Sequence, residues 1–313
     1  LALASSGELL KHKVLQSQVG RMRQDPRFER FIRHFSSQWL GLSAMEHVAV
    51  NPKAHPEFSD AVRENLRAET LAFASHVFRN DLNCLRFIQS DFAILNQVTA
   101  SHYEIEGVYG SRFRPVRVTN DRGGILTQGS VALIGSDGTE SNPIYRGVWL
   151  RKRLFADPPP PPPPGAPPLA KPDGSKLTLK EQIERHRKQP ACARCHSQID
   201  PWGIAFEAYG ATGRLKAASG RGKSGVMFDA STDLPDGSHV NGMVDLQGWL
   251  IKHRSGDLAN AIARRMAEYA LGRRLEFSDN EMVDQLTDQF IRGDLRVSTL
   301  VDGIVTSEVF LTK

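Results

Sequence analysis

The stretch Cys192-Ala193-Arg194-Cys195-His196 decides how the rest of this sequence is interpreted, because it has the C-x-x-C-H spacing of covalent haem attachment. On one turn of a helix, two thiols can form thioethers with the vinyl groups of a haem while the next imidazole binds the iron. In a chain with three Cys and ten His, the pattern arises by chance in roughly one sequence in a thousand. The motif therefore predicts one covalent haem c, held by Cys192 and Cys195, with His196 as the proximal iron ligand.

Three other interpretations of the motif are less favoured. A thioredoxin-like redox pair is expected in a βαβ setting, and a zinc site needs two further ligands, commonly a second pair of cysteines. The third cysteine, Cys84, stands alone in a stretch with helical periodicity, and we expect it to be a buried thiol. A chance occurrence without function is the remaining alternative.

The residues around the motif suit a haem. Trp202 and Phe206 belong to an apolar segment that can wall a porphyrin, although they would serve any small core equally well. Between residues 180 and 223, nine basic residues, including Arg214, stand against four acidic ones. Such cations can pair with haem propionates or attract an acidic redox partner, although most of them are expected on a solvated surface. His186 is expected to bond a propionate or a backbone carbonyl.

Length and composition place the chain among globular proteins. Its 313 residues are 40% hydrophobic and 24% charged, which excludes a wholly disordered chain and allows one large domain or several small ones. The formal net charge of +5 is too small and too scattered to indicate nucleic-acid binding. No apolar run approaches the ~18 residues that a membrane helix needs, so no membrane span is predicted in this chain.

Hydrophobic periodicity predicts a mainly α fold in four parts. Residues 1–155 form a helical domain whose 107–147 segment is irregular and rich in Gly, Ser, Asn and Pro. Residues 156–172 include seven consecutive prolines and form a stiff polyproline spacer, with a docking motif for a proline-binding module as the less favoured alternative. A loop-rich, cytochrome c-like haem segment follows at 173–245, and C-terminal helices at 246–313 close the chain.

Local signals predict where individual helices begin and end. Helix starts are predicted at a cap, Asp91, and at two capping boxes, Thr178/Glu181 and Ser278/Glu281. Helix ends are predicted at Gly272 and Gly293.

A set of short motifs, spread over nearly the whole chain, matches a known family. The motifs are Trp39-Leu40-Gly41-Leu42, Leu95-Asn96, His102-Tyr103, Arg122-Gly123-Gly124-Ile125-Leu126-Thr127-Gln128, Arg146-Gly147 with Trp149, His186-Arg187 and Pro190 leading into the C-x-x-C-H motif, Ile199-Asp200-Pro201, Gly213-Arg214, Leu234-Pro235-Asp236-Gly237 and Tyr269-Ala270-Leu271-Gly272-Arg273. In these motifs the chain resembles the C-terminal part of the planctomycete-type multidomain c-type cytochromes, which are built from domains of unknown function. The resemblance implies that the chain is one piece of a larger assembly, because family precursors extend upstream of what corresponds to Leu1.

The distal iron ligand is predicted with less direct support. His102 lies at helical spacing from the apolar Leu95 and Val98, where an imidazole needs a partner to offset its burial. A hydrogen-bonded core histidine is the alternative for this residue. Because His102 occupies the His-Tyr position of the family it resembles, we predict that it binds the iron, with Met243 as the alternative ligand.

The predicted function is that of a periplasmic or cell-surface c-type cytochrome module that passes electrons through one haem, because haem c is attached outside the bacterial cytoplasm. One alternative is a haem-containing subunit of an oxidoreductase, with a catalytic or substrate site in residues 1–150. Another is a structural scaffold that the haem stabilises. No hydrolytic triad or carboxylate pair is evident, so no catalytic residue is predicted. The expected partners are the upstream part of the same precursor or another subunit, and a redox protein that is acidic.

Overall fold

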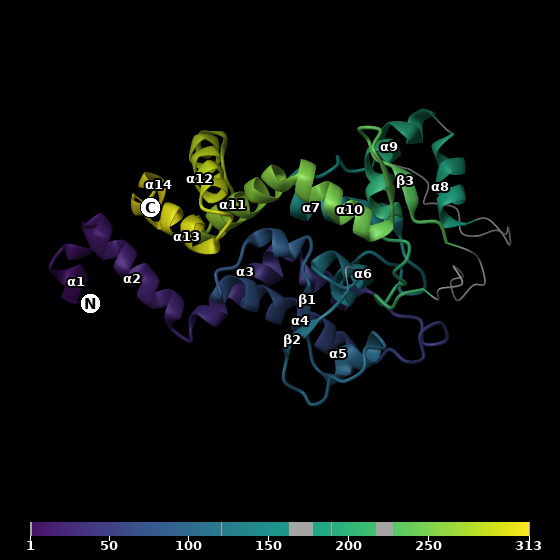
Figure 1. Cartoon of the computed structure of the whole chain (residues 1–313). Coiled ribbons are helices and arrows are strands. Elements are labelled where there is room, and N and C mark those ends of the chain that lie inside the picture. Colours follow the sequence, from purple (N-terminus) through teal and green to yellow (C-terminus); the bar gives the residue numbers. More distant parts are fainter. Residues whose placement is uncertain (1, 120, 163–177, 189, 217–227, 313) are drawn as a thin grey trace.

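The computed structural model describes residues 2–119, 121–162, 178–188, 190–216 and 228–312 (Figure 1). The described chain is mainly helical, with two small antiparallel sheets of two strands each. The predicted fold class is therefore confirmed. Most of the predicted polyproline spacer and the start of the predicted haem segment, residues 163–177, lie outside the described residues.

The first part of the chain is helical, as predicted. Its helices are α1 (Ala2–Ser5), α2 (His12–Gln24), α3 (Phe28–Leu40) and α4 (Asp60–Arg79). Helix α3 buries Ile32, Phe35 and Trp39 at three- and four-residue steps, so one of its faces packs into the core. Ser59 caps α4, because its hydroxyl accepts a hydrogen bond from the Val62 N–H.

The segment after Asp91 is a strand where the sequence predicted a helix. Strand β1 (Phe92–Leu95) pairs antiparallel with β2 (Arg114–Arg117). Helix α5 (Gln97–His102) starts only after this strand, because Asn96 caps it with a capping box. The predicted cap at Asp91 is therefore wrong, since pairing with a segment distant in the sequence overrides the local helical pattern.

The segment 107–147 is more ordered than its composition suggested. Besides β2 it contains helix α6 (Gly129–Ile134) and the first residues of α7 (Pro143–Leu154). Asn142 caps α7 by accepting a hydrogen bond of 3.2 Å from the Tyr145 N–H, and Pro143 occupies the first turn. The Asn-Pro pair is thus the local signal for this helix.

Two helices and a hairpin surround the C-x-x-C-H motif. They are α8 (Leu179–Arg187), α9 (Pro190–Ile204), β3 (Ser231–Asp233) and β4 (His239–Asn241). The predicted capping box at Thr178/Glu181 is present at the start of α8. Helix α9 carries the whole motif, and β3 lies beside it (Figure 1).

The C-terminal helices end where the glycines predicted. They are α10 (Gly242–His253), α11 (Ser255–Leu271), α12 (Asn280–Arg292), α13 (Val297–Val305) and α14 (Glu308–Leu311). Gly272 ends α11 with a φ of 66°, in the left-handed region, and Gly293 ends α12.

The capping box predicted at Ser278/Glu281 is wrong. Glu276 and Asp279 form the observed capping box, which opens a 3-10 turn before α12. Arg273 donates a hydrogen bond of 2.6 Å to the Asp279 carboxylate and so fixes it at this position. The contact that decides the start of this turn therefore comes from outside the local pattern.

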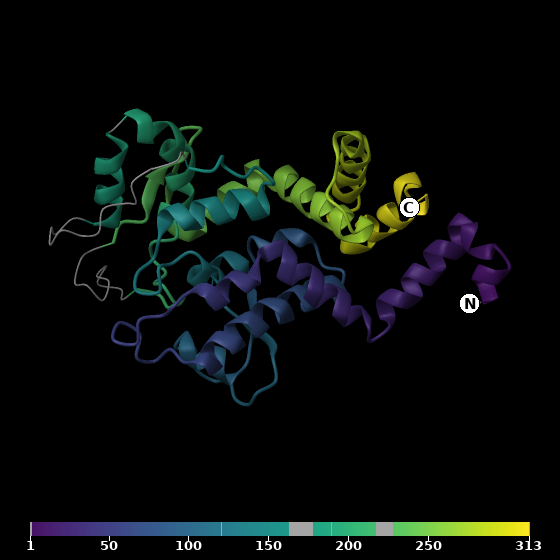
Figure 2. The same cartoon turned by 180° about the vertical axis from the view of Figure 1, so that it is seen from behind.

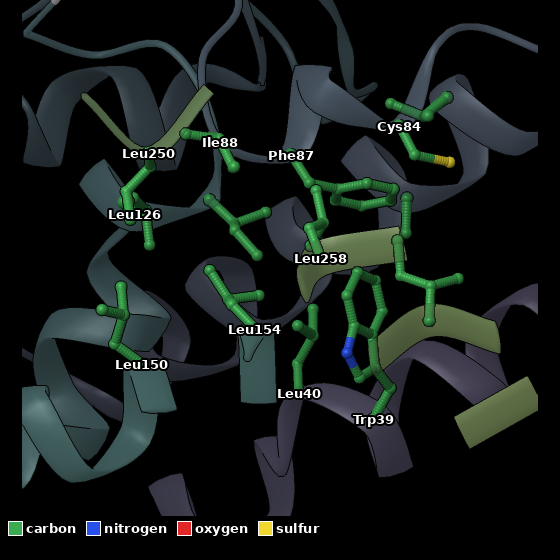
Figure 3. Packing of buried hydrophobic residues seen from close by; sticks show 14 of the residues in the cluster. Trp39, Leu40, Cys84, Phe87, Ile88, Leu126, Leu150, Leu154, Leu250 and Leu258 are labelled. Atoms are coloured by element: carbon green, nitrogen blue, oxygen red, sulfur yellow. The ribbon is translucent and has the colours of Figure 1, made fainter. Parts of the chain in front are cut away.

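One hydrophobic core joins the N-terminal and C-terminal helices. It packs Trp39 of α3 and Leu150 of α7 with Leu250 of α10 and Leu258 of α11, all of them buried (Figure 3). Cys84 lies fully buried in the same core, which confirms the predicted buried thiol, and burial raises the pKa of that thiol.

Both chain termini lie at one end of the molecule, and α8 and α9 lie at the other (Figure 1 and Figure 2). Helix α2 extends from the core toward α13, which it contacts. The helix with the C-x-x-C-H motif is therefore anchored by its contacts with α7, α8 and β3, away from both ends of the chain.

Helices α7 and α9 approach each other closely at two glycines. A Cβ atom on Gly203 would lie 1.7 Å from the backbone oxygen of Pro143, and a Cβ on Gly147 would lie 2.2 Å from that of Ile199. Neither position can hold a larger residue unless the backbones separate. The two glycines thus set the distance between α9 and the helix that supports it.

Replacing Gly203 by alanine is expected to destabilise the protein by about 1–3 kcal/mol, because the added methyl group forces α7 and α9 apart. The free energy of unfolding in denaturant measures this loss. Gly248→Ala in α10 is the matched control, because no heavy atom lies within 4 Å of its would-be Cβ. The control should gain up to about 1 kcal/mol from helix propensity. Equal stability of the two variants would contradict the close packing of α7 on α9.

Candidate functional site

The C-x-x-C-H motif lies on the first turns of α9. Cys192 and Cys195 are three positions apart, with two residues between them, and both are half-buried, so both thiols face one side of the helix. The ring of His186 on α8 lies edge-on to the ring of His196, with 4.8 Å between their centroids. Partial burial, with a smaller contribution from His196, lowers the pKa of His186. The structure thus brings two of the predicted haem-binding histidines together.

A buried carboxylate holds the imidazole of His196. The Nδ1 atom of His196 lies 3.0 Å from Oδ1 and 3.1 Å from Oδ2 of Asp200, one helical turn later. The Asp200 side chain is 0% exposed, whereas that of His196 is 20% exposed. Burial raises the pKa of Asp200 to about 6, and the neighbouring His196 opposes this rise. An N–H at Nδ1 therefore has a fixed acceptor, and Nε2 has no hydrogen-bond partner among the described residues.

A cleft of about 610 Å³ runs along α9 between α8 and the β3–β4 hairpin. Ala193 and Ser197 of α9 form part of its wall. Three cations line it without an ion-pair partner in the described parts of the chain, and these are Arg187, Lys188 and Arg194. Glu184 and Asp233 also line the cleft, but the basic side chains outnumber these acidic ones, so the cleft can pair with the carboxylates of an anionic group.

The residues present fit a haem c. Two accessible thiols lie one turn apart, the adjoining histidine keeps Nε2 available, and that histidine is oriented by a carboxylate, as iron-binding histidines usually are. The cationic cleft can take the propionates. Within the described residues no cluster of three or more His, Cys, Asp or Glu side chains could hold a bare metal ion.

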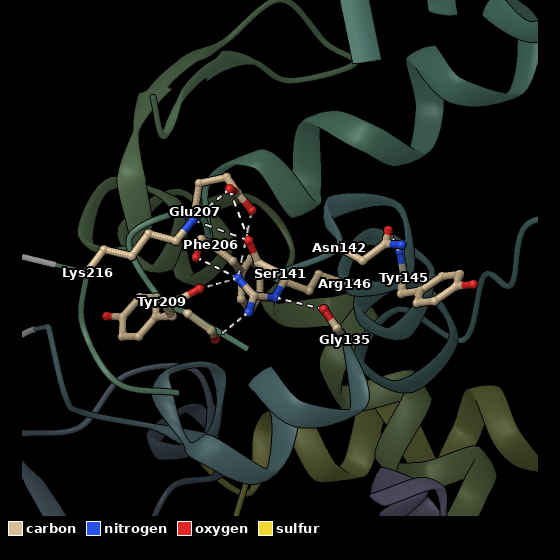
Figure 4. Close-up of polar contacts among 10 residues, drawn as sticks. Gly135, Ser141, Asn142, Tyr145, Arg146, Phe206, Glu207, Tyr209 and Lys216 are labelled. Carbon is tan, nitrogen blue, oxygen red and sulfur yellow. Dashed lines mark hydrogen bonds and ion pairs between the residues drawn. The ribbon is translucent and has the colours of Figure 1, made fainter. Parts of the chain in front are cut away.

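An arginine cluster fixes the segment that follows the motif helix. The guanidinium of Arg146 is buried and donates hydrogen bonds of 2.8 Å to the carbonyls of Phe206 and Tyr209 and of 2.9 Å to that of Gly210 (Figure 4). Its Nε reaches the carbonyl of Gly135 at 3.2 Å. Nearby, Lys216 contacts Glu207 at 3.0 Å and Ser141 at 3.3 Å, and both partners are buried. Arg146 therefore fastens residues 206–210 to α7.

His102 lies in a different polar environment from His196. It is buried, and its Nε2 lies 2.8 Å from the backbone oxygen of Thr212, in the loop after the motif helix. Burial lowers the pKa of His102 to about 4. These contacts favour the hydrogen-bonded core histidine that the sequence left open, because the bond to Thr212 would have to break before Nε2 could bind iron. The distal-ligand role of His102 stays a prediction.

The other predicted site residues make contacts with residues outside the motif. Met243 is buried in the main core on α10, and Arg214 pairs with Glu57 at 3.5 Å beside the cleft that His102 lines. Trp202 is buried against Phe155, the residue that follows α7, with 5.3 Å between ring centroids. Their predicted roles toward a haem stay predictions.

Phe206 is likewise buried in the main core. Its side chain thus packs in a core, which was the alternative to walling a porphyrin in the sequence analysis. Its backbone oxygen accepts a hydrogen bond from Arg146. A role in walling a porphyrin stays a prediction.

Sequence reasoning missed two residues that organise the site. Asp200 has a local signal, because its spacing of four residues from His196 places both side chains on one face of a helix. Arg146 belongs to the Arg146-Gly147 motif of the family resemblance, but no local signal predicts its contacts, because three of its four carbonyl partners lie about 60 residues later along the chain.

The fold and the site define a mainly helical chain with a C-x-x-C-H helix, and three family models match consecutive parts of it. Residues 1–105 match a protein of unknown function (DUF1592), residues 122–219 another (DUF1588) and residues 236–310 a third (DUF1585). These are domains of the planctomycete-type multihaem cytochrome c family. No curated protein and no solved structure matches the chain. None of the described helices has the length and apolar character needed to cross a membrane.

Proposed function

We propose that the chain is a c-type cytochrome module that carries one covalent haem and passes electrons. The observation that carries the proposal is the position of the motif, with both thiols accessible on α9 and the His196 imidazole held by the buried Asp200. The three matched domains, which are associated with cytochrome c-type proteins, support it. The haem supplies an iron that alternates between ferrous and ferric states.

Each part of the site has a separate task in this proposal. Cys192 and Cys195 would hold the porphyrin through thioether bonds, and His196 would present Nε2 to the iron. Arg187 and Arg194 would neutralise propionates from the wall of the cleft. The close packing of α9 on α7 would keep the two thiols and the imidazole in place.

The chemistry of haem attachment also supports a location for the protein. Because haem c is attached outside the bacterial cytoplasm, we propose a periplasmic or cell-surface location. The cations Arg187, Lys188 and Arg194 face solvent or the cleft beside the motif, and they suit a redox partner with an acidic surface. The upstream part of the same precursor, or another subunit, is the second proposed partner.

A redox titration tests the proposal against its alternatives. The purified protein should show the absorption bands of haem c and a single reversible one-electron transition, with low-spin iron that reacts slowly with cyanide and peroxide. Rapid reaction with peroxide would instead favour the oxidoreductase subunit. A haem that cannot be reduced and reoxidised reversibly would leave only the scaffold role.

A further inference from the structure

Asp200 is a buried carboxylate with a single hydrogen-bonding neighbour among the described residues. Its side chain is 0% exposed, and the only hydrogen-bond donor that the described chain brings to its oxygens is Nδ1 of His196, at 3.0 and 3.1 Å. Burying a carboxylate is costly unless it is paired, and the contact with His196, helped by the nearby positive charge of Arg187, repays only part of that cost. A structural role alone would be served equally well by a neutral side chain of the same shape. A role that depends on the negative charge of the Asp200 carboxylate therefore explains its burial better than a purely structural role.

We propose that Asp200 is a positioning residue that keeps the proton of His196 on Nδ1 and makes Nε2 a stronger electron donor to the haem iron, so that the haem has a lower reduction potential. This inference rests on the proposed function, because it concerns the same site. The observation behind this inference is the contact between the His196 imidazole and the Asp200 carboxylate across one turn of α9.

The geometry of α9 holds this pair rigidly. Residues four apart on a helix lie on one face, so the backbone itself aims the carboxylate at the ring. The neighbouring Ile199 is buried, and its backbone oxygen packs so closely on Gly147 of α7 that a Cβ atom there would lie only 2.2 Å away. Little freedom remains for Asp200 to turn away. The ring of His196 is therefore fixed both in tautomer and in direction.

The electronic effect follows from the charge of the acceptor. A carboxylate that accepts the Nδ1 proton raises the basicity of the other ring nitrogen more than a neutral carbonyl does. A more basic ligand stabilises ferric iron over ferrous iron, because the ferric ion has the higher positive charge. Asp200 thus biases the module toward donating electrons.

Asp200→Asn removes the charge and preserves the shape of the side chain. We expect the variant to carry haem at the same stoichiometry as the unmodified protein, measured as the pyridine haemochrome. At a fixed potential near the midpoint, its ratio of reduced to oxidised haem should rise at least tenfold, which equals about 59 mV for one electron. Asp288→Asn is the matched control. Asp288 is exposed on α12, which lies away from α9 (Figure 1), so loss of its charge should leave the ratio within twofold.

The outcomes separate this inference from the proposed function. Full haem content with an unchanged ratio in Asp200→Asn would overturn the inference and leave the cytochrome function intact, and so would an equal shift in Asp288→Asn. An unmodified protein without covalent haem would overturn both. If Asp200→Asn does not fold, NMR of isotope-labelled histidine in the unmodified protein decides. A slowly exchanging proton on Nδ1 of His196 supports the inference, and a proton in rapid exchange with water contradicts it.

Discussion

Replacing Cys192 and Cys195 together by alanine is expected to give a protein without covalent haem. The two thiols are the only ones on α9, and no other described cysteine lies in a C-x-x-C-H sequence. His196 alone would hold a haem only through the iron, a bond that acid breaks. Denaturing electrophoresis followed by a stain for haem peroxidase activity should therefore show a strong band for the unmodified chain and none for the variant.

Cys84 supplies the matched control, because it is the third cysteine of the chain. Its thiol is fully buried in the main core, and burial raises its pKa, so it is a poor nucleophile. Cys84→Ala should keep the full haem signal and lose about 1 kcal/mol of stability from the small cavity that it leaves. A haem band that survives in the double variant, or vanishes in Cys84→Ala, would contradict the assignment of the attachment site.

Arg146→Met is expected to destabilise the protein by about 3–5 kcal/mol. The change removes four hydrogen bonds to carbonyls and leaves the buried carbonyl of Tyr209 with no other donor among the described residues. The carbonyls of Gly135, Phe206 and Gly210 each lose one of two donors and keep a backbone N–H. It also removes the cation that faces the buried Glu207 at 4.0 Å. Thermal unfolding and denaturant titration measure the loss. We expect it to be accompanied by faster hydrogen exchange in residues 206–210.

Lys152→Met is the control for this change, because Lys152 lies on the same helix, is exposed, and is not a hydrogen-bond or ion-pair partner of Arg146 in the described chain. Surface substitutions of this kind change stability by about 0.5 kcal/mol or less. Similar stabilities for the two variants would show that the Arg146 cluster is not what fastens the segment after the motif helix.

The helices of this fold could be predicted where their signals are local. The C-terminal glycines and the capping box of Thr178 and Glu181 act on their own neighbours, and the structure has them where the sequence placed them. The segment after Asp91 could not be predicted in this way, because its partner strand lies at Arg114–Arg117. The Asn142 cap of α7 was a readable signal in a segment dominated by turn-forming residues.

The candidate site shows the same division. Cys192, Cys195 and His196 are recognisable because attachment chemistry requires one fixed spacing. The contact between His186 and His196 depends on how α8 packs against α9, and no sequence pattern predicts this packing. For His102, the sequence predicted the apolar helical face on which the residue lies. It could not predict the hydrogen bond to Thr212, because this bond joins segments 110 residues apart.

Acid-acetone extraction of the purified, unmodified protein tests the central claim most directly. Thioether bonds survive this treatment, whereas a haem held only by iron ligands dissolves in the organic phase. We predict that one haem per chain stays with the polypeptide and that peptide mass analysis finds it on the fragment with Cys192 and Cys195. Recovery of all the haem in the acetone phase, or of a protein that never contained haem after expression with the haem c maturation machinery, would contradict the account.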